Sequence, residues 1–392
     1  MQFFNFGDGR DGAIGSGVIN AYASCTGTAG SNTVTSSLSV SVGMLVLLHQ
    51  TQGSGANNFE VVKVQTPGSG SFTIQGTLVN SYTTGAQAVS IPQYNSGNLS
   101  GGMSSTAWNG SYGGIITFAY NSKLFVTSNV DVSSAGFRGA SNVSGGGTVG
   151  RQGEGTPNFN QSQSTSANGN GGGGGGYSNN NPWNQGNAGG GGGNGASGAG
   201  GRGTGGGNNV GGGGGSGGSS SGTSDGISLG LGGGGGSGGV GTGNSGSSGG
   251  GANGGGLVII FAKEIDVTAG FILANGGTGG NCVYPLGAGG GGAGGSILIF
   301  AQKADIGTNR LQANGGIGGY VGSGGSNLDG RGGPGSGGRI IVNACVHTGS
   351  GQVNGNDFSV YGGADNNPTS SAGTFSAVDG GRPYCGSGTV VI

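Results

Sequence analysis

The feature that most constrains this chain is a tract at residues 171–256, in which 46 of 86 residues are glycine. Fixing such a backbone costs on the order of 100 kcal/mol in conformational entropy, because each residue costs roughly 1–2 kcal/mol. An isolated glycine chain has no side chains to bury against that cost. The tract is therefore either a disordered linker or a bundle in which glycine backbones pack closely and pair N–H with C=O.

The spacing of the glycine runs favours the packed bundle. Four runs recur at intervals of about twenty residues, separated by Asn, Ser and aromatic clusters suited to turns: 171–176, 189–193, 211–215 and 232–236. A flexible linker needs no such rhythm. We therefore expect packed polyglycine-II helices, which are left-handed with three residues per turn, and the linker remains the alternative.

A second pattern is a strand repeat with a period of 39 residues. Residues 257–262 match 296–301, Asp266-Val267 matches Asp305-Ile306, and 274–277 match 313–316. Looser copies begin at Gly114 and Gly338, and the chain ends on a fifth strand-like piece, 389–392. Fixed-period repeats indicate stacked units with a shared core, here a β-solenoid or a stacked β-sandwich. Both faces of residues 258–261 are apolar, so this strand should be covered on both sides.

The remaining sequence completes an all-β prediction. Residues 21–95 contain short alternating strands separated by Gly and Pro turns, which is typical of a small antiparallel barrel or sandwich. No window shows an apolar stripe at helical spacing. We expect an N-terminal arm at 1–20, a small β domain at 21–112, and a glycine-rich repeat domain at 113–392 that combines strand repeats with polyglycine tracts.

The charge and the hydropathy of the chain exclude several classes of protein. The chain of 392 residues has 12 Lys+Arg and 13 Asp+Glu, a formal net charge of −1, whereas nucleic-acid binders and polybasic membrane-surface proteins need a basic face. The apolar runs are far shorter than the ~20 residues of a membrane helix, and the N-terminus lacks a secretory signal pattern. We expect a virion-surface or extracellular location without membrane insertion.

Residues 42–139 contain a series of short motifs whose order resembles that of a known family. They are found at 46–53, 59–61, 81–82, 92–94 and 108–110. Their order is similar to that in a module of glycine-rich bacterial surface proteins, and residues 136–139 and 152–155 also resemble that family. Separately, the glycine runs between 171 and 338 resemble the polyglycine-II sandwich of bacteriophage tail-tip adhesins. That resemblance implies that loops at the sandwich tip bind host surface receptors, and neither resemblance brings catalytic residues.

The candidate receptor-binding residues are aromatic and amide side chains within glycine-rich surroundings. They are Tyr177, Asn180, Trp183, Tyr284 and Tyr320. Aromatic rings on rigid loops beside Asn amides suit the recognition of sugars or protein surfaces. The alternative is that these rings plug the ends of the glycine bundle.

The patterns around the remaining Asp, Cys and His residues indicate structural roles. The spacing of Asp8 and Asp11 is too short for a calcium loop, so we expect a plain Asp-Gly turn and no metal site. Cys345 and Cys385 are the best placed for a disulfide, although all four cysteines, including Cys25 and Cys282, also fit as small buried residues. His49 and His347 lie beside apolar strands and are interpreted as structural histidines. We expect no catalytic residue and no cofactor.

Three functions remain. The first is a non-enzymatic virion or cell-surface adhesin that displays loops on a stiff scaffold and works as a homo-oligomer with other surface subunits. The second is a self-assembling filament or coat subunit, in which strand edges and flat glycine faces pair between copies. The third, a polysaccharide depolymerase, is disfavoured because Asp266 and Asp305 are placed too regularly for an acidic catalytic cluster.

Overall fold

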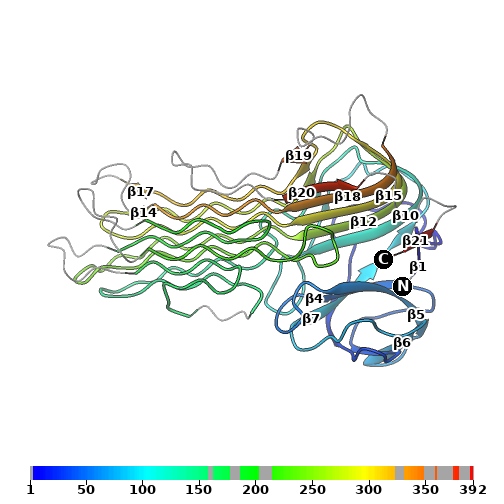
Figure 1. Ribbon diagram of the computed structural model, residues 1–392, viewed down its shortest axis with the longest axis horizontal. Coiled ribbons are helices and arrows are strands. Elements are labelled where there is room, and N and C mark those ends of the chain that lie inside the picture. The colour runs from blue at the N-terminus through cyan, green and yellow to red at the C-terminus, as the bar shows by residue number, and fades with distance from the viewer. Residues whose placement is uncertain are drawn as a thin grey trace.

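The computed structural model describes residues 3–157, 162–176, 186–202, 214–322, 331–347, 358–359, 374–378 and 389–391. Their regular secondary structure is all β-strand, in several sheets, so the all-β prediction is confirmed. Figure 1 shows a barrel below, curved parallel sheets above it, and long glycine-rich segments that extend away from both. Within the described ranges, no helix is present that could cross a membrane.

Six antiparallel strands close on themselves in the order β2-β3-β6-β5-β4-β7. Their bounds are β2 (Tyr22–Thr26), β3 (Thr33–Ser36), β4 (Leu45–Gln50), β5 (Phe59–Thr66), β6 (Ser71–Ile74) and β7 (Ala86–Ile91). Val46, Leu48 and Val62 point into the barrel core, whereas Leu45 and Leu47 belong to a second core outside it. Strand β4 is buried along its whole length for this reason.

Two parallel sheets are built from successive units, and each unit from β8 to β18 contributes one strand to each sheet. The six-stranded sheet contains, in order, β20 (Thr374–Val378), β18 (Arg339–His347), β15 (Ser296–Ile306), β12 (Leu257–Val267), β10 (Ile115–Phe125) and β8 (Gln93–Tyr94). The five-stranded sheet contains β19 (Phe358–Ser359), β16 (Leu311–Gln312), β13 (Ile272–Leu273), β11 (Val130–Asp131) and β9 (Met103–Ser104). Leu257 pairs with Ser296 and Asp266 with Asp305, so the 39-residue period is the register between β12 and β15.

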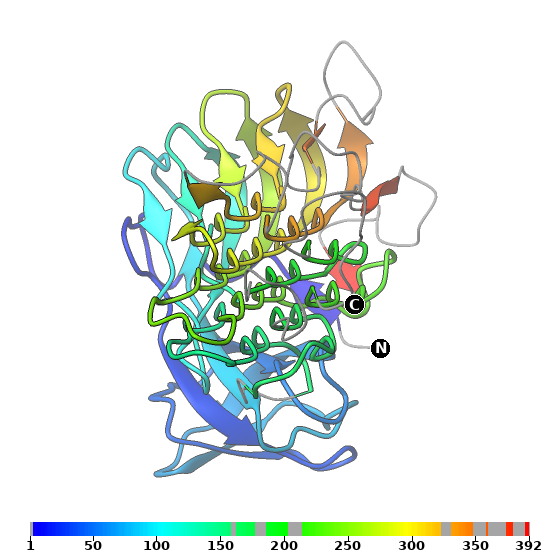
Figure 2. The same ribbon diagram turned by 90° about the vertical axis from the view of Figure 1, so that its left-hand side faces the viewer.

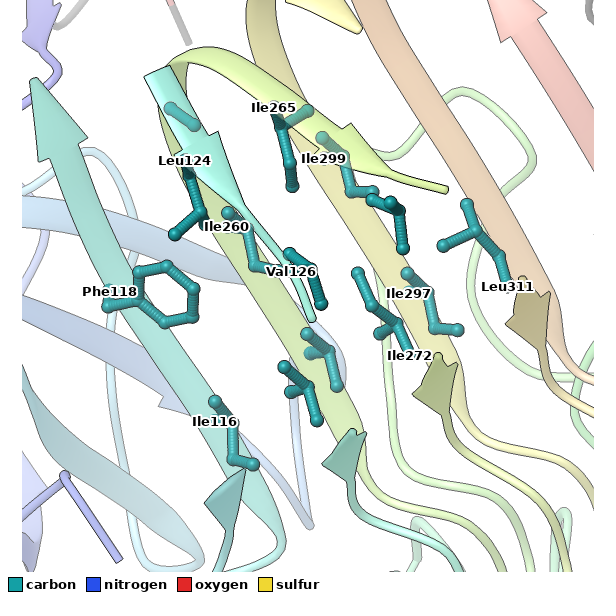
Figure 3. Packing of buried hydrophobic residues seen from close by; sticks show 14 of the residues in the cluster. Ile116, Phe118, Leu124, Val126, Ile260, Ile265, Ile272, Ile297, Ile299 and Leu311 are labelled. Carbon is teal, nitrogen blue, oxygen red and sulfur yellow. The ribbon is translucent and has the colours of Figure 1, made fainter. Parts of the chain in front are cut away.

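The central strands are covered on both faces, as the apolar run at 258–261 predicts. Val258 and Ile260 pack between the two parallel sheets with residues such as Phe118 and Leu311 (Figure 3). Ile259 and Phe261 face the other way and join the core shared with Leu47 of the barrel. The six-stranded sheet is therefore the middle layer between the barrel and the smaller sheet.

The glycine segments form an ordered array in which hydrogen bonds repeat every three residues. Figure 2 looks along these segments. Successive N–H groups of residues 232–240 point to three neighbouring segments in turn. Gly232, Gly235 and Gly238 donate to Gly255, Ala252 and Gly249; Gly233, Gly236 and Gly239 donate to Gly193, Gly190 and Asn187; Gly234, Ser237 and Val240 donate to Glu154, Arg151 and Thr148. Segment 232–240 therefore runs antiparallel to these three partners, whereas other neighbours are parallel: Gly291 and Gly294 donate to Gly333 and Ser336.

The array leaves no space for side chains at its interior glycines. A Cβ atom added to Gly235 would lie 2.1 Å from the carbonyl oxygen of Gly290, and one on Gly236 would lie 2.0 Å from that of Gly173. Real Cβ atoms do not approach so closely. The described parts of the tract are thus packed by backbone contact, and glycine is required there by the available space.

Both ends of the chain depart from the sequence expectation. The terminal piece Thr389–Val391 (β21) pairs antiparallel with β1 (Phe3–Asn5), so it is not a further strand of the repeat, and β20 occupies that position in the sheet. Strands β8 and β9 belong to the parallel sheets although they precede residue 112. The N-terminal arm also pairs with this first unit, through Ala13 with Ser96 and Gly17 with Met103.

Candidate functional site

The end of the glycine array far from the barrel carries two of the predicted binding residues. There β14 (Cys282–Val283) pairs in parallel with β17 (Val321–Gly322), and Figure 1 places both strands at the distal end, away from the two termini. Tyr284 follows β14 directly and Tyr320 precedes β17 directly. The fold thus brings both tyrosines to one end of the molecule.

Exposed apolar side chains gather around this strand pair. Tyr320 is 55% exposed and Val283 is 63% exposed, and Ile317 is also exposed, whereas Tyr284 is half-buried. Ile317 and Tyr320 are three residues apart, so a backbone with a three-residue repeat presents them on the same side. We call Val283, Ile317 and Tyr320 the distal patch.

Two asparagine side chains link the neighbouring segments, one beside this patch and the other near the ends of β13 and β16. The Tyr320 N–H donates to Asn281 Oδ1 at 3.0 Å, and the Asn314 N–H donates to Asn275 Oδ1 at 2.8 Å. Both contacts join residues 39 positions apart, which is the period of the strand repeat. Asn281, Val283 and Ile317 belong to no motif that marks them in the sequence, although the same period, extended beyond residue 277, aligns Asn281 with Tyr320.

The other three predicted binding residues, Tyr177, Asn180 and Trp183, lie outside the described residues. Their role in binding therefore stays a prediction. The ordered segments on either side of them, 171–176 and 186–195, are part of the glycine array.

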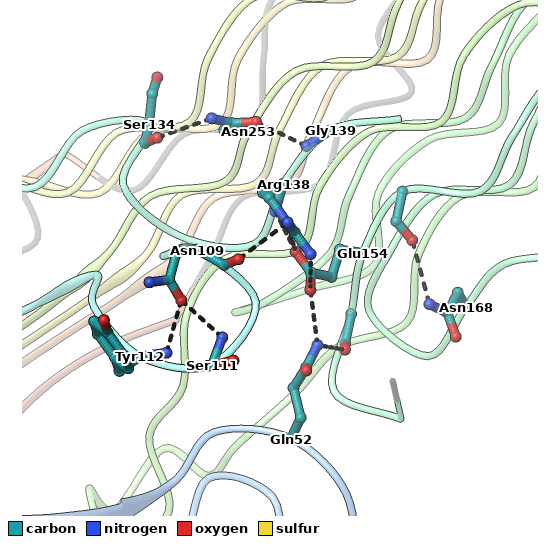
Figure 4. Close-up of polar contacts among 12 residues, drawn as sticks. Gln52, Asn109, Ser111, Tyr112, Ser134, Arg138, Gly139, Glu154, Asn168 and Asn253 are labelled. Atoms are coloured by element: carbon teal, nitrogen blue, oxygen red, sulfur yellow. Dashed lines mark hydrogen bonds and ion pairs between the residues drawn. The ribbon is translucent and has the colours of Figure 1, made fainter. Parts of the chain in front are cut away.

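A buried carboxylate, paired with a partly exposed arginine, joins the array to the barrel (Figure 4). Arg138 Nε donates to Glu154 Oε2 at 2.8 Å, and the Arg138 backbone N–H donates to the same oxygen at 3.0 Å. Gln52, from the barrel, donates through Nε2 to Glu154 Oε1 at 3.3 Å and to the Gly155 carbonyl at 2.9 Å. Arg138 also donates to the Asn109 carbonyl at 3.1 Å. The Glu154 side chain is fully buried, and its hydrogen bond raises the pKa of Arg138.

This cluster explains several of the short motifs. Gln52, Asn109, Arg138 and Glu154 come from four of the motif segments and meet at one point. Next to them, the Trp108 and Phe137 rings pack edge to face with centroids 5.9 Å apart. The contacts satisfy a buried charge and fix the barrel on the array, which is a structural task.

His49 has the structural role expected for it. Its ring is fully buried, with Nδ1 2.8 Å from Thr51 Oγ1 and Nε2 2.7 Å from the Leu229 carbonyl oxygen. Burial lowers the pKa of His49 to about 4. The side chain is therefore neutral at pH 7 and links the barrel to the residues just before the glycine segment 232–240. The side chain of His347 is outside the described part.

The remaining candidates give no metal or redox centre within the described ranges. Asp8 pairs with Arg10, and Asp11 accepts the Gln93 N–H; no group of three or more His, Cys, Asp or Glu residues is placed to hold a metal there. Cys25 and Cys282 are free thiols, and burial raises the pKa of each to about 12. The Cys345 side chain and Cys385 lie outside the described part, so the expected pairing stays a prediction.

Comparisons with protein-family models, with curated proteins and with solved structures found no match to this chain.

Proposed function

We propose that this chain is a non-enzymatic structural protein of a virion or cell surface, and that it acts as an adhesin through the distal end of its glycine array. The observation that carries the proposal is the distal patch. Three exposed apolar side chains gather at the end farthest from the barrel, on a backbone held by hydrogen bonds in three directions. A rigid scaffold of this kind lowers the entropy cost of presenting a binding surface.

In this proposal the array consists of polyglycine-II helices and the strand repeat is a β-solenoid. The three-residue rhythm of the hydrogen bonds at 232–240 supports the first assignment. The in-register parallel pairing of β10, β12, β15 and β18 supports the second. The solenoid and barrel then form the base that joins other surface subunits, and the array extends from it.

The chemistry of the distal end predicts how a receptor is bound. Residues 278–288 and 314–322 contain no charged side chain, so long-range electrostatic steering contributes little. Binding relies on apolar contact and amide hydrogen bonds, which are weak at a single site. An adhesin of this type works through several copies, and its attachment is insensitive to moderate salt.

Location is the first test. Immunogold electron microscopy with antibodies to this chain should label the surface of virions or cells of the source organism. Label confined to the cell interior would contradict the proposal. Open-ended polymers formed by the purified chain would favour the self-assembling subunit instead.

Attachment is the second test. Purified chain should compete with the native particle for host cells, and the double variant Val283→Ser with Tyr320→Ala should lose this competition. The matched control is Val42→Ser with Val79→Ser, because both valines are exposed on the barrel end. A second double variant, Tyr177→Ala with Trp183→Ala, should also abolish attachment and leave assembly intact. If the patch variant competes as well as the parent, the distal patch is not the binding surface.

A further inference from the structure

An open cavity of about 780 Å³ lies where the barrel meets the first loops of the glycine array. One wall is the outer face of β2 and β3, and the opposite wall includes Gly110, Ser111 and Pro157. Its size is within the range of small-molecule sites, roughly 300–1,000 Å³. The distal patch is at the other end of the molecule, so this cavity plays no part in the proposed receptor contact.

Hydroxyl groups dominate the polar lining. Six of the lining side chains, each exposed, are Ser24, Thr26, Thr35, Ser37, Thr84 and Ser111. Thr26 and Thr35 are directly paired across β2 and β3, and Ser24 and Ser37 lie two positions from them on the same face. Within the described ranges none of these six hydroxyls makes a side-chain hydrogen bond, so all of them are available to a ligand.

The walls of the cavity are fixed by hydrogen bonds between the segments that form them. The Gly53 N–H donates to the Thr156 carbonyl at 2.8 Å, which ties the Pro157 wall to the barrel. The N–H groups of Thr51 and Gln52 both donate to the Gly85 carbonyl at 3.1 Å, and Gln50 Nε2 donates to the Thr84 carbonyl at 3.2 Å. A ligand would therefore meet a preformed surface.

The lining contains no Asp, Glu, Lys, Arg or His. Its one titratable group is the buried Cys25 thiol, which is protonated at neutral pH. Between the hydroxyls lie apolar surfaces: the threonine methyls and the Pro157 ring. A ligand that matches this surface is uncharged, carries many hydroxyl groups and also has C–H faces.

We propose that this cavity is a binding site for a neutral saccharide. The sugar hydroxyls pair with the six serine and threonine hydroxyls, and its C–H faces pack on the threonine methyls and Pro157. The proposal does not depend on the adhesin assignment, because it rests on a different part of the molecule.

The test uses the full chain with labelled threonine methyl groups and neutral probes: glucose, galactose, mannose, N-acetylglucosamine, lactose and maltotriose. At roughly 10 mM, which fills about nine tenths of a site with a Kd of about 1 mM, at least one probe should shift the Thr26, Thr35 and Thr84 methyl signals. The double variant Thr26→Val with Thr35→Val keeps β-branched side chains and removes two hydroxyls. It should raise the Kd about tenfold or more.

The matched control is Thr33→Val with Thr73→Val, a cross-strand pair on the same barrel that does not line the cavity. It should bind like the parent. Three outcomes would each overturn the proposal: no methyl shift with any probe, equal affinity in the Thr26/Thr35 variant and the parent, or binding of glucuronic acid in preference to every neutral sugar. A loss of affinity in the control pair equal to that in the Thr26/Thr35 variant would also overturn it.

Discussion

The rings of Phe261 and Phe300 lie face to face, with centroids 5.3 Å apart and planes 2° from parallel. The two residues are paired across β12 and β15 and are 39 positions apart in the sequence. Both are buried in the core that joins the six-stranded sheet to the barrel. Equivalent phenylalanines of two successive repeat units are therefore stacked on each other in the structure.

Replacing Phe300 with alanine should destabilise the chain by about 3–5 kcal/mol, because it removes a stacked ring and leaves a cavity. Denaturant unfolding measures the change. Phe125→Ala is the control, since Phe125 is 38% exposed, and its cost should be about 1 kcal/mol or less. A similar loss for both variants would show that burial at Phe300 does not determine the effect.

Gly235→Ala should disrupt the glycine array, because its Cβ would lie 2.1 Å from the Gly290 carbonyl oxygen. Gly200→Ala is a control in the same array: its Cβ would lie 3.4 Å from the Gly215 carbonyl oxygen, and the residue is exposed. Hydrogen exchange of the array amides gives the readout. Protection should fall in the first variant and persist in the second. Full exchange of the parent array within seconds would contradict the packed structure.

His49 should make stability depend on pH. Its pKa is lowered by burial from 6.5 to about 4, so between these values the unfolded chain binds a proton that the folded chain does not. The contribution of neutral His49 to the free energy of unfolding is therefore fully present above pH 6.5. It is lost as the pH falls toward 4, and the loss is at most about 3 kcal/mol. In the His49→Gln variant, the free energy of unfolding should depend less on pH across this range. Denaturant unfolding at several pH values measures it, and His347→Gln is the comparison variant. An unchanged slope in His49→Gln would exclude this origin.

The Arg138–Glu154 pair should be strongly coupled. Arg138→Met leaves the buried Glu154 carboxylate without its cation, and such a loss costs up to about 3–5 kcal/mol, less here because Arg138 is 38% exposed. A double-mutant cycle with Glu154→Gln measures the coupling. Arg10→Met breaks the exposed pair with Asp8 and should cost about 1 kcal/mol or less. Equal costs for Arg138→Met and Arg10→Met would show that burial of Glu154 adds nothing.

The candidate site was only partly accessible to sequence reasoning. Tyr284 and Tyr320 stood out as aromatics among glycines, and the structure brings them to one end. Val283 and Ile317 did not stand out, because isolated apolar residues carry no signal until their exposure is known. The cavity lined by Thr26, Thr35 and Pro157 joins segments far apart in the chain, and no local pattern indicates such a meeting.

The sequence alone determined the register of one strand pair, β12 with β15. These strands belong to units of equal length, so the 39-residue period already paired Leu257 with Ser296. The pairings of Ile115 with Leu257 and of Ser296 with Arg339 have other offsets and follow from the tertiary structure. Only the tertiary structure decided which glycine segments are neighbours, because glycine has no side chain to distinguish one segment from another. It also decided that Thr389–Val391 pairs with β1 and that Gln52 reaches Glu154, since both contacts depend on how the completed barrel, parallel sheets and glycine array meet in space.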